Sequence, residues 1–211
     1  MRQTRIPLFP LDLVLFPGMT LPLHIFEPRY KLMVARCLEE NLEFGMILAE
    51  GKTASKIGCT AEIVRKIKDY PDGRMDIVAE GRAIFRLLKV LEEKEYYEAI
   101  VEYPSDELST QDPRVESRLR DLFQQYRTLL TSEPWVAPDR NPKGDGPRGS
   151  LAYSMAEALP LELRERQELL EMRAEDVRRA YLARWIGESL PRLIERQQLR
   201  RTSGGNGHRP N

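Results

Sequence analysis

The sequence predicts an α+β protein in which a β-rich region with one helix, residues 1–104, precedes a helical region, residues 105–201. Apolar residues alternate with polar ones in short runs before Pro104, and after it they recur at helical spacing. In addition, Pro71-Asp72-Gly73 lies between two alternating runs and predicts a β-hairpin. A chain of 211 residues is long enough to bury a core without disulfides or metals.

The elements expected in the β-rich region are separated by proline and glycine. Residues 6–23 are expected to form a strand, a tight turn at Phe16-Pro17-Gly18 and a second short strand. A helix is predicted to begin at Pro28 and to end near Asn41, because apolar residues follow at helical spacing. A polar loop is expected around residues 51–58. Further strands are expected at residues 44–49, 61–70, 74–81, 84–90 and 96–103.

The helical region is predicted to contain four helices and two segments without regular structure. The helices are expected at residues 115–130, 151–159, 161–172 and from Asp176 to about Arg201, with a kink or break at Pro191. Residues 131–150 are rich in proline and glycine, which predicts a long mobile loop. Residues 202–211 are polar and are expected to be a disordered tail.

Composition excludes several classes of partner and location. The chain has 33 Lys+Arg and 33 Asp+Glu, so no net charge attracts nucleic acid or an anionic membrane. Prolines interrupt the apolar stretch near the amino terminus, and no apolar run reaches the roughly 18 residues of a membrane-spanning helix. Cys37 and Cys59 can form at most one disulfide, which favours a reducing, cytoplasmic compartment.

The residues that carry catalysis in other proteins are absent or badly spaced. The sequence contains no GxxxxGK[ST] loop for nucleotide phosphates and no dinucleotide-binding glycine motif after a strand. Its two histidines, His24 and His208, do not assemble a Ser-His-Asp or Cys-His arrangement. Two cysteines and two histidines at these spacings do not supply a zinc site. We therefore expect no enzyme activity, no cofactor and no metal.

Three stretches resemble a known family. They are IPLFPLDLVLFPGMTLPLHIFEPRY at residues 6–30, the PDG hairpin followed by VAEGRAIFRL, and LPLELRERQELLEM at residues 159–172. Together they resemble the amino-terminal substrate-binding domain of the ATP-dependent Lon proteases in its free-standing form, over roughly residues 5–201. The resemblance implies a PUA-like, six-stranded β-domain with one helix, followed by a helical bundle. It also implies recognition of unfolded or tagged polypeptides for an ATPase and a peptidase, and neither of these is expected in this chain.

The function that we expect is non-catalytic binding of unfolded or apolar polypeptide segments, or of a protein partner, in protein quality control. Aromatic and methionine side chains near the Pro-rich strands are the candidate contacts, namely Phe9, Phe16, Met19, Phe26 and Tyr30. For each of them the alternative is a place in the core. Glu27 is also expected to stabilise a helix amino terminus, with Arg29 paired to an acidic residue elsewhere in the fold.

Two further interactions follow from other residues. PUA-like domains include RNA readers, and the hairpin carries Arg65, Lys66, Lys68 and Arg74. The interleaved Glu62, Asp69, Asp72 and Asp76 argue against this alternative of RNA binding. The last helix has a wide apolar surface, which is compatible with self-association or with burial on two sides. Its apolar residues are Val177, Tyr181, Leu182, Trp185, Ile186, Leu190, Leu193 and Ile194.

Overall fold

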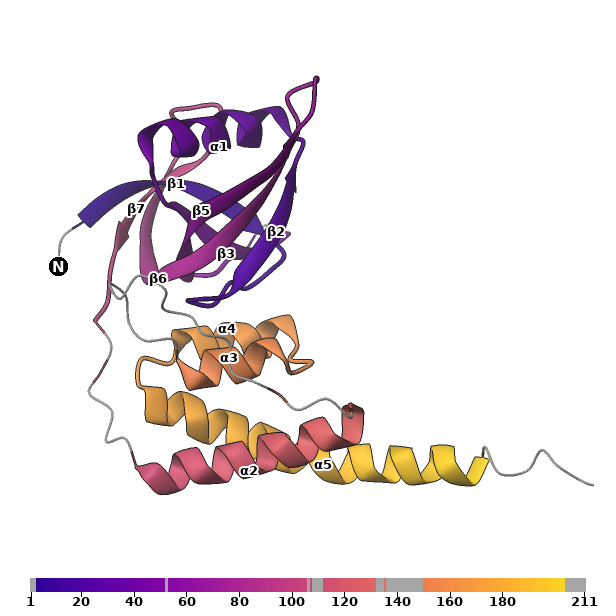
Figure 1. Ribbon diagram of the computed structural model, residues 1–211. Coiled ribbons are helices and arrows are strands. Elements are labelled where there is room, and N and C mark those ends of the chain that lie inside the picture. The colour runs from indigo at the N-terminus through magenta and orange to yellow at the C-terminus, as the bar shows by residue number, and fades with distance from the viewer. Residues whose placement is uncertain are drawn as a thin grey trace, which may run out of the picture. The chain divides into compact units, whose positions relative to one another are not determined.

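The computed structural model describes residues 3–51, 53–105, 107, 112–131, 135 and 150–203 (Figure 1). The strands in these residues are β1 (Gln3–Leu11), β2 (Thr20–Ile25), β3 (Phe44–Glu50), β4 (Thr53–Ala54), β5 (Ile57–Asp69), β6 (Met75–Leu91) and β7 (Glu98–Glu102). The helices are α1 (Pro28–Glu40), α2 (Pro113–Leu130), α3 (Leu151–Glu157), α4 (Leu163–Glu171) and α5 (Glu175–Ser203). The α+β class is therefore confirmed.

The chain forms two compact units whose boundaries differ from the predicted division after residue 104. One unit consists of Met1–Glu107 and Asp139–Arg173, and the other of Leu108–Pro138 and Ala174–Asn211. Consequently α3 and α4 belong with the strands, and among the described elements α2 and α5 make up the second unit. The physical reason lies in contacts between α3, α4 and the sheet. The Tyr153 ring stacks on Phe16 at 4.9 Å, and the Gln167 side chain donates to the Ile57 carbonyl at 3.1 Å.

The strands of the first unit form a closed path. β1 pairs with β3 in parallel and with β7 in antiparallel orientation. β7 continues to β6, β6 to β5, and β5 returns to β3. β2 pairs with the first half of β6 outside this path, from Thr20 opposite Glu80 to Ile25 opposite Met75. With the two-residue β4, the described sheet has seven strands, one more than the six that the family resemblance implied.

The strands predicted at residues 74–81 and 84–90 are one continuous strand, β6, which is a correction to the sequence prediction. Gly81 does not end the strand. Instead its amide donates to the Met19 carbonyl at 2.9 Å, and its carbonyl accepts from the Gly18 amide at 2.8 Å. A Cβ atom at residue 81 would lie 2.2 Å from the Phe16 carbonyl oxygen, so glycine allows the turn before β2 to approach the strand.

Helix α1 and the β5–β6 hairpin confirm the predictions made for them. Pro28 begins α1, and Asn41 ends it in a left-handed conformation with φ of 53°. The buried face of α1 packs into the core of the first unit through Tyr30, Met33, Val34 and Cys37. In the hairpin turn, Gly73 has φ of 80°, which favours glycine, and the Tyr70 amide donates to the Arg74 carbonyl at 2.9 Å.

A buried carboxylate joins three elements of the first unit. Glu98 on β7 is 3% exposed. Its carboxylate oxygens lie 2.5 Å from a guanidinium nitrogen of Arg5 on β1, 2.8 Å from one of Arg36 on α1 and 3.1 Å from the Lys94 ammonium nitrogen. Burial raises the pKa of the Glu98 carboxyl, but hydrogen bonds from these three cations outweigh burial and hold the pKa below its usual value. The ionised Glu98 therefore ties α1 to the strands.

The second unit is a pair of helices. α2 is capped by Asp112, whose carboxylate accepts from the Arg114 amide at 2.9 Å, and it runs nearly as predicted. Arg179 on α5 pairs with Glu116 on α2 at 2.8 Å. α5 continues through Pro191 without a break, and it includes Thr202 and Ser203, which were expected to belong to the tail. The remaining tail residues, and most of the loop expected at residues 131–150, lie outside the described residues.

Candidate functional site

Of the five predicted contact residues, three lie in the core of the first unit. The centre of the Phe9 ring lies 4.1 Å from that of Tyr30 and 6.1 Å from that of Phe44. Both Phe9 and Tyr30 are buried. Phe16 is fully buried, at 0% exposure. Met19 is half-buried and packs against the core beside β2. In contrast, Phe26 is 58% exposed, so among the five it offers the most surface to a partner.

The exposure of Phe26 follows from the alternation of β2. Ile25 ends the strand with its side chain buried, so the next residue points the opposite way. Pro28 then begins α1, which leaves Phe26 between a strand and a helix. Along β2 the outward positions are Thr20, Pro22 and His24, all exposed. Phe26 therefore continues an outward-facing row of side chains beyond the end of the strand.

Phe26 belongs to a surface group that we call the Phe26 cluster, which consists of His24, Phe26, Tyr70 and Asp76. The His24 ring stacks on Phe26 with centroids 6.0 Å apart, and it meets the Tyr70 ring edge-on at 5.7 Å. His24 Nδ1 lies 2.6 Å from one carboxylate oxygen of Asp76, and the Tyr70 hydroxyl donates to the other at 2.8 Å. Asp76 therefore holds two of the three rings in place.

The electrostatics of Asp76 support this arrangement. Hydrogen bonds from His24 and then from Tyr70 hold the pKa of the Asp76 carboxyl below its usual value. The ionised carboxylate accepts from the Tyr70 hydroxyl, and we assign a proton to His24 Nδ1 because the same carboxylate faces that atom. Rings fixed in this way lose little conformational entropy when a partner binds them.

Sequence analysis selected Phe26 but missed its three partners. His24 lies directly opposite Asp76 in the β2–β6 register, and Tyr70 is brought alongside by the β5–β6 hairpin. The available signal was the alternation of β2 together with the position of Asp76 in the second hairpin strand. That signal required the pairing of β2 with β6, which no local pattern specifies.

Two cations, Lys68 and Arg74, contact the Tyr70 ring of the cluster, and nearby cations on the hairpin are paired with carboxylates. Lys68 Nζ lies 4.4 Å from the centre of the Tyr70 ring, and Arg74 Cζ lies 5.0 Å from the same centre. Arg74 also pairs with Asp72 at 2.7 Å, and Lys66 pairs with Asp69 at 2.8 Å. These pairs reduce the charge available to a nucleic acid, as the interleaved acidic residues suggested.

The pairing expected for Arg29 is wrong in one respect. Arg29 pairs with Glu27, two residues away, at 2.8 Å, and with no acidic residue elsewhere in the described part of the fold. Its guanidinium also lies 4.6 Å from the centre of the Tyr30 ring and 6.0 Å from that of Tyr97. The short separation between Glu27 and Arg29 and the position of Tyr30 account for this geometry. Arg29 thus lies over the buried Tyr30 ring and close to the half-buried Tyr97 ring.

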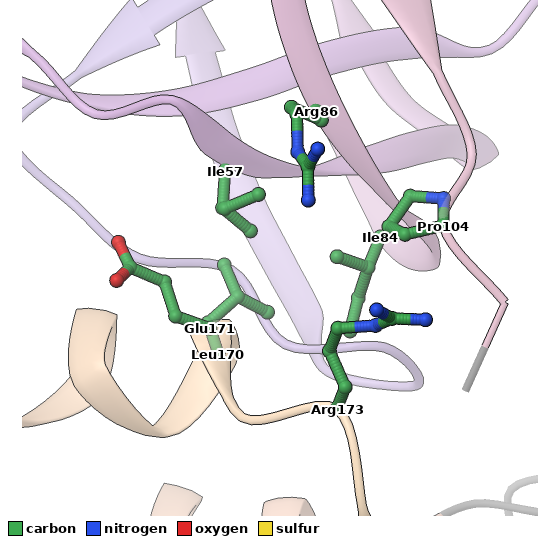
Figure 2. A pocket seen from close by; sticks show the side chains of 7 residues that line it. All are labelled: Ile57, Ile84, Arg86, Pro104, Leu170, Glu171 and Arg173. Carbon is green, nitrogen blue, oxygen red and sulfur yellow. The ribbon is translucent and has the colours of Figure 1, made fainter. Parts of the chain in front are cut away.

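A small cavity of the first unit lies where the strands meet α4. Figure 2 shows Arg86 and Ile84 facing Leu170 and Arg173 across a cavity of about 50 Å³. This volume holds on the order of four water molecules. Its arginines already have acidic partners, since Arg86 lies 3.2 Å from Glu102 and Arg173 3.3 Å from Glu107. The cavity therefore offers a polypeptide much less contact than the Phe26 cluster does.

Other chemistry finds little support in the residues that the structure describes. Within them, no group of three His, Cys, Asp or Glu side chains is placed to bind a metal. Cys37 and Cys59 are free and buried, and burial raises the pKa of the Cys37 thiol to about 12 and that of Cys59 further still. No helix in the described part of the chain is long and apolar enough to span a membrane.

The fold is thus α+β, and Phe26 is the most exposed aromatic side chain among the described residues. The chain belongs to the family of substrate-binding domains of the ATP-dependent protease La (LON), whose family model matches residues 5–185. The resemblance seen in the sequence is confirmed. The match is to the substrate-binding part of these proteases, and their ATPase and peptidase domains are not in these 211 residues.

Relatives and solved structures agree with this assignment. The chain is 26% identical to the Lon protease of Erwinia amylovora and 27% identical to Lon protease 2 of Syntrophobacter fumaroxidans, over 94% and 76% of its length. It spans only 26% and 21% of those two relatives. Among structures, it resembles a Lon N-terminal domain protein from Xanthomonas campestris, with a TM-score of 0.64, 26% identity, and coverage of 86% of this chain and 98% of that one.

A second structure supports the fold alone. The N-terminal domain of a Mycobacterium avium complex Lon protease has a TM-score of 0.66 at 16% identity, with coverage of 87% of this chain and 98% of that one. An identity this low carries information on the path of the chain and none on its ligands. Both structures therefore place the strands and helices described above within one fold.

Proposed function

We propose that this protein is a non-catalytic module that binds unfolded or apolar polypeptide segments, and that the Phe26 cluster is its contact surface. The observation that carries this function is the exposed Phe26 ring, stacked on a His24 ring that Asp76 holds in place. Aromatic side chains supply a large contact area with little demand on the sequence of the partner. Membership of a family of substrate-binding domains makes a polypeptide the reasonable partner.

Within this function the five predicted residues have different roles. Phe26 makes the contact, and Met19, half-buried at the other end of β2, packs against the core and supports that end of the strand. Phe9, Phe16 and Tyr30 are buried and act by holding β2 and α1 in position. A bound segment would follow the outward row of side chains from Thr20 to Phe26.

Several wider features belong to the same proposal. A role in protein quality control and a PUA-like barrel are supported by the family match and by the closed strand path. A reducing, cytoplasmic location is supported by two free, buried cysteines. Self-association through α5 stays a prediction, with Val177 and Ile194 exposed on that helix and Leu182 and Ile186 buried.

The function is tested by replacing Phe26 and measuring binding to an unfolded polypeptide. The probe is fluorescently labelled lysozyme that has been reduced and carboxamidomethylated, and the readout is fluorescence anisotropy. Phe26→Ser is expected to weaken binding about tenfold, the effect typical of an aromatic contact residue. Leu199→Ser is the matched control, because Leu199 is 60% exposed and lies on α5. Absence of binding by the unchanged protein, or equal losses for both variants, would contradict the proposed function.

A further inference from the structure

The closed strand path leaves two strand edges uncovered. β5 pairs with β3 only at residues 59–61, so the edge of residues 62–69 opposite β6 has no neighbouring strand in the described part of the chain. The side of β2 opposite β6 likewise has none. Val64 to Asp69 are all exposed, as expected for a hairpin arm that projects beyond the barrel next to α1 (Figure 1). An uncovered edge presents N–H and C=O groups to a further strand.

The two edges differ in what they offer. Pro22 lies within β2 and has no N–H group, so the β2 edge has a gap in its donors. No proline lies within β5. The edge of residues 62–69 is therefore the better site for an added strand.

Two β-bulges place apolar side chains on this part of β5. The register passes from Ile63 to Arg65 and from Lys66 to Lys68 while β6 advances by a single residue each time. Val64 and Ile67 are thus the extra residues, and they are 42% and 55% exposed. A bulge leaves the extra residue outside the ladder, so both side chains are available to a partner.

The charges on the edge are cationic and only partly compensated. Glu62 pairs with Arg82 at 2.6 Å, and Lys66 pairs with Asp69 at 2.8 Å. Arg65 and Lys68 have no carboxylate within ion-pair distance among the described residues, although Lys68 lies opposite Asp76 and helps to lower the pKa of that carboxyl. Two copies paired antiparallel about the centre of this segment would set Arg65 opposite Lys66 twice, and like charges directly opposite each other are destabilising. Charge therefore disfavours a second copy and favours an acidic partner.

We propose that the edge of β5 at residues 62–69 binds an acidic, extended polypeptide segment as an added strand. Carboxylates of the segment face Arg65 and Lys68, and its apolar side chains contact Val64 and Ile67. The edge ends at the Phe26 cluster, because Lys68 lies over the Tyr70 ring and that ring contacts His24. The inference rests on the proposed function and adds the chemistry of the preferred segment to it.

The first experiment compares charge. The probes are labelled peptides of about eight residues, enough to span the edge, in which Val alternates with Glu or with Lys. The Glu peptide is expected to bind the unchanged protein at least about tenfold more tightly than the Lys peptide. The double variant Arg65→Glu/Lys68→Glu is expected to bind the Lys peptide more tightly than the Glu peptide. The control Lys89→Glu/Arg118→Glu alters net charge equally at exposed cations elsewhere and should keep the order. Equal effects of the two double variants would overturn the proposal.

The second experiment tests strand addition. Two versions of the Glu peptide carry methyl groups on the odd or on the even backbone nitrogens, so that only one version loses the donors that face β5. One version is expected to lose binding and the other to retain it. Equal binding by both versions would overturn the proposal. Tighter binding of a single-stranded RNA oligonucleotide, with an affinity that falls steeply in added salt, would also overturn it.

If the unfolded lysozyme binds through Phe26 while the Glu peptide does not bind, only this inference fails. If neither probe binds, the proposed function fails too.

Discussion

Phe16 and Phe26 lie at opposite ends of β2, and the structure gives them opposite environments. Phe16 precedes the strand, is 0% exposed, and is covered by the Tyr153 ring at 4.9 Å and the Arg166 guanidinium at 5.5 Å. Phe26 follows the strand, is 58% exposed, and contacts the His24 ring. Both residues looked like equal contact candidates in the sequence. The comparison shows that cover from α3 and α4, far along the chain, decides which aromatic residue remains available.

The largest expected effect comes from removing the buried ring. Phe16→Ala deletes a fully buried side chain and leaves a cavity under Tyr153, so the free energy of unfolding should fall by about 4 kcal/mol. Phe26→Ala removes an exposed ring and should change it by less than about 1 kcal/mol. Urea unfolding of both variants, followed by circular dichroism, measures the two values. A similar loss for both would mean that the Phe26 cluster contributes to folding as much as the core does.

The same contrast explains what could be predicted from the sequence. α1 and the β5–β6 hairpin follow from local signals, namely Pro28, the apolar stripe and Pro71-Asp72-Gly73. The burial of Phe16 depends on Tyr153, and the assignment of α4 to the first unit depends on the bond from Gln167 to Ile57. Such contacts join segments that no local pattern relates. For the same reason the sequence indicated Phe26 but not Asp76, which reaches His24 only through strand register.

A second pair of residues sharpens the comparison between buried and exposed sites. Glu98 and Asp76 are both carboxylates whose pKa is held below the usual value, but Glu98 is buried among three cations and Asp76 is on the surface with the Phe26 cluster. Glu98→Gln leaves Arg5, Arg36 and Lys94 without their shared partner. At neutral pH it should lower the free energy of unfolding by about 3 kcal/mol.

This effect should depend on pH in a defined direction. Because the pKa of Glu98 is lower in the folded protein, the unfolded chain binds more protons as pH falls below about 4.3, the usual value for glutamate. The stability that the Glu98 charge contributes is present above that pH and is lost as pH falls through the folded pKa. The difference between the unchanged protein and Glu98→Gln should therefore shrink toward about pH 2 in urea titrations.

A matched carboxylate serves as the control for this titration. Glu168 forms an exposed pair with Arg164 at 3.1 Å, and Glu168→Gln should change stability by no more than about 0.5 kcal/mol at any pH. A difference for Glu98→Gln that stays constant from neutral to acid pH would show that the Glu98 charge is not the source of the stability. The buried network would then act through packing alone.

The smallest of these stability effects tests how the buried end of β2 is held. Gly81→Ala places a Cβ 2.2 Å from the Phe16 carbonyl oxygen, and the turn from Phe16 to Met19 can retreat only by weakening its bonds to β6. The free energy of unfolding is expected to fall by about 2 kcal/mol. Gly187→Ala is the control, because a Cβ there meets open space on α5 and should raise stability by up to about 1 kcal/mol. If Gly81→Ala lowers the free energy of unfolding no more than the control does, the turn from Phe16 to Met19 can shift without loss of stability. The close approach to β6 would then not be what keeps Phe16 buried, and the cover from Tyr153 and Arg166 would have to account for the difference from Phe26.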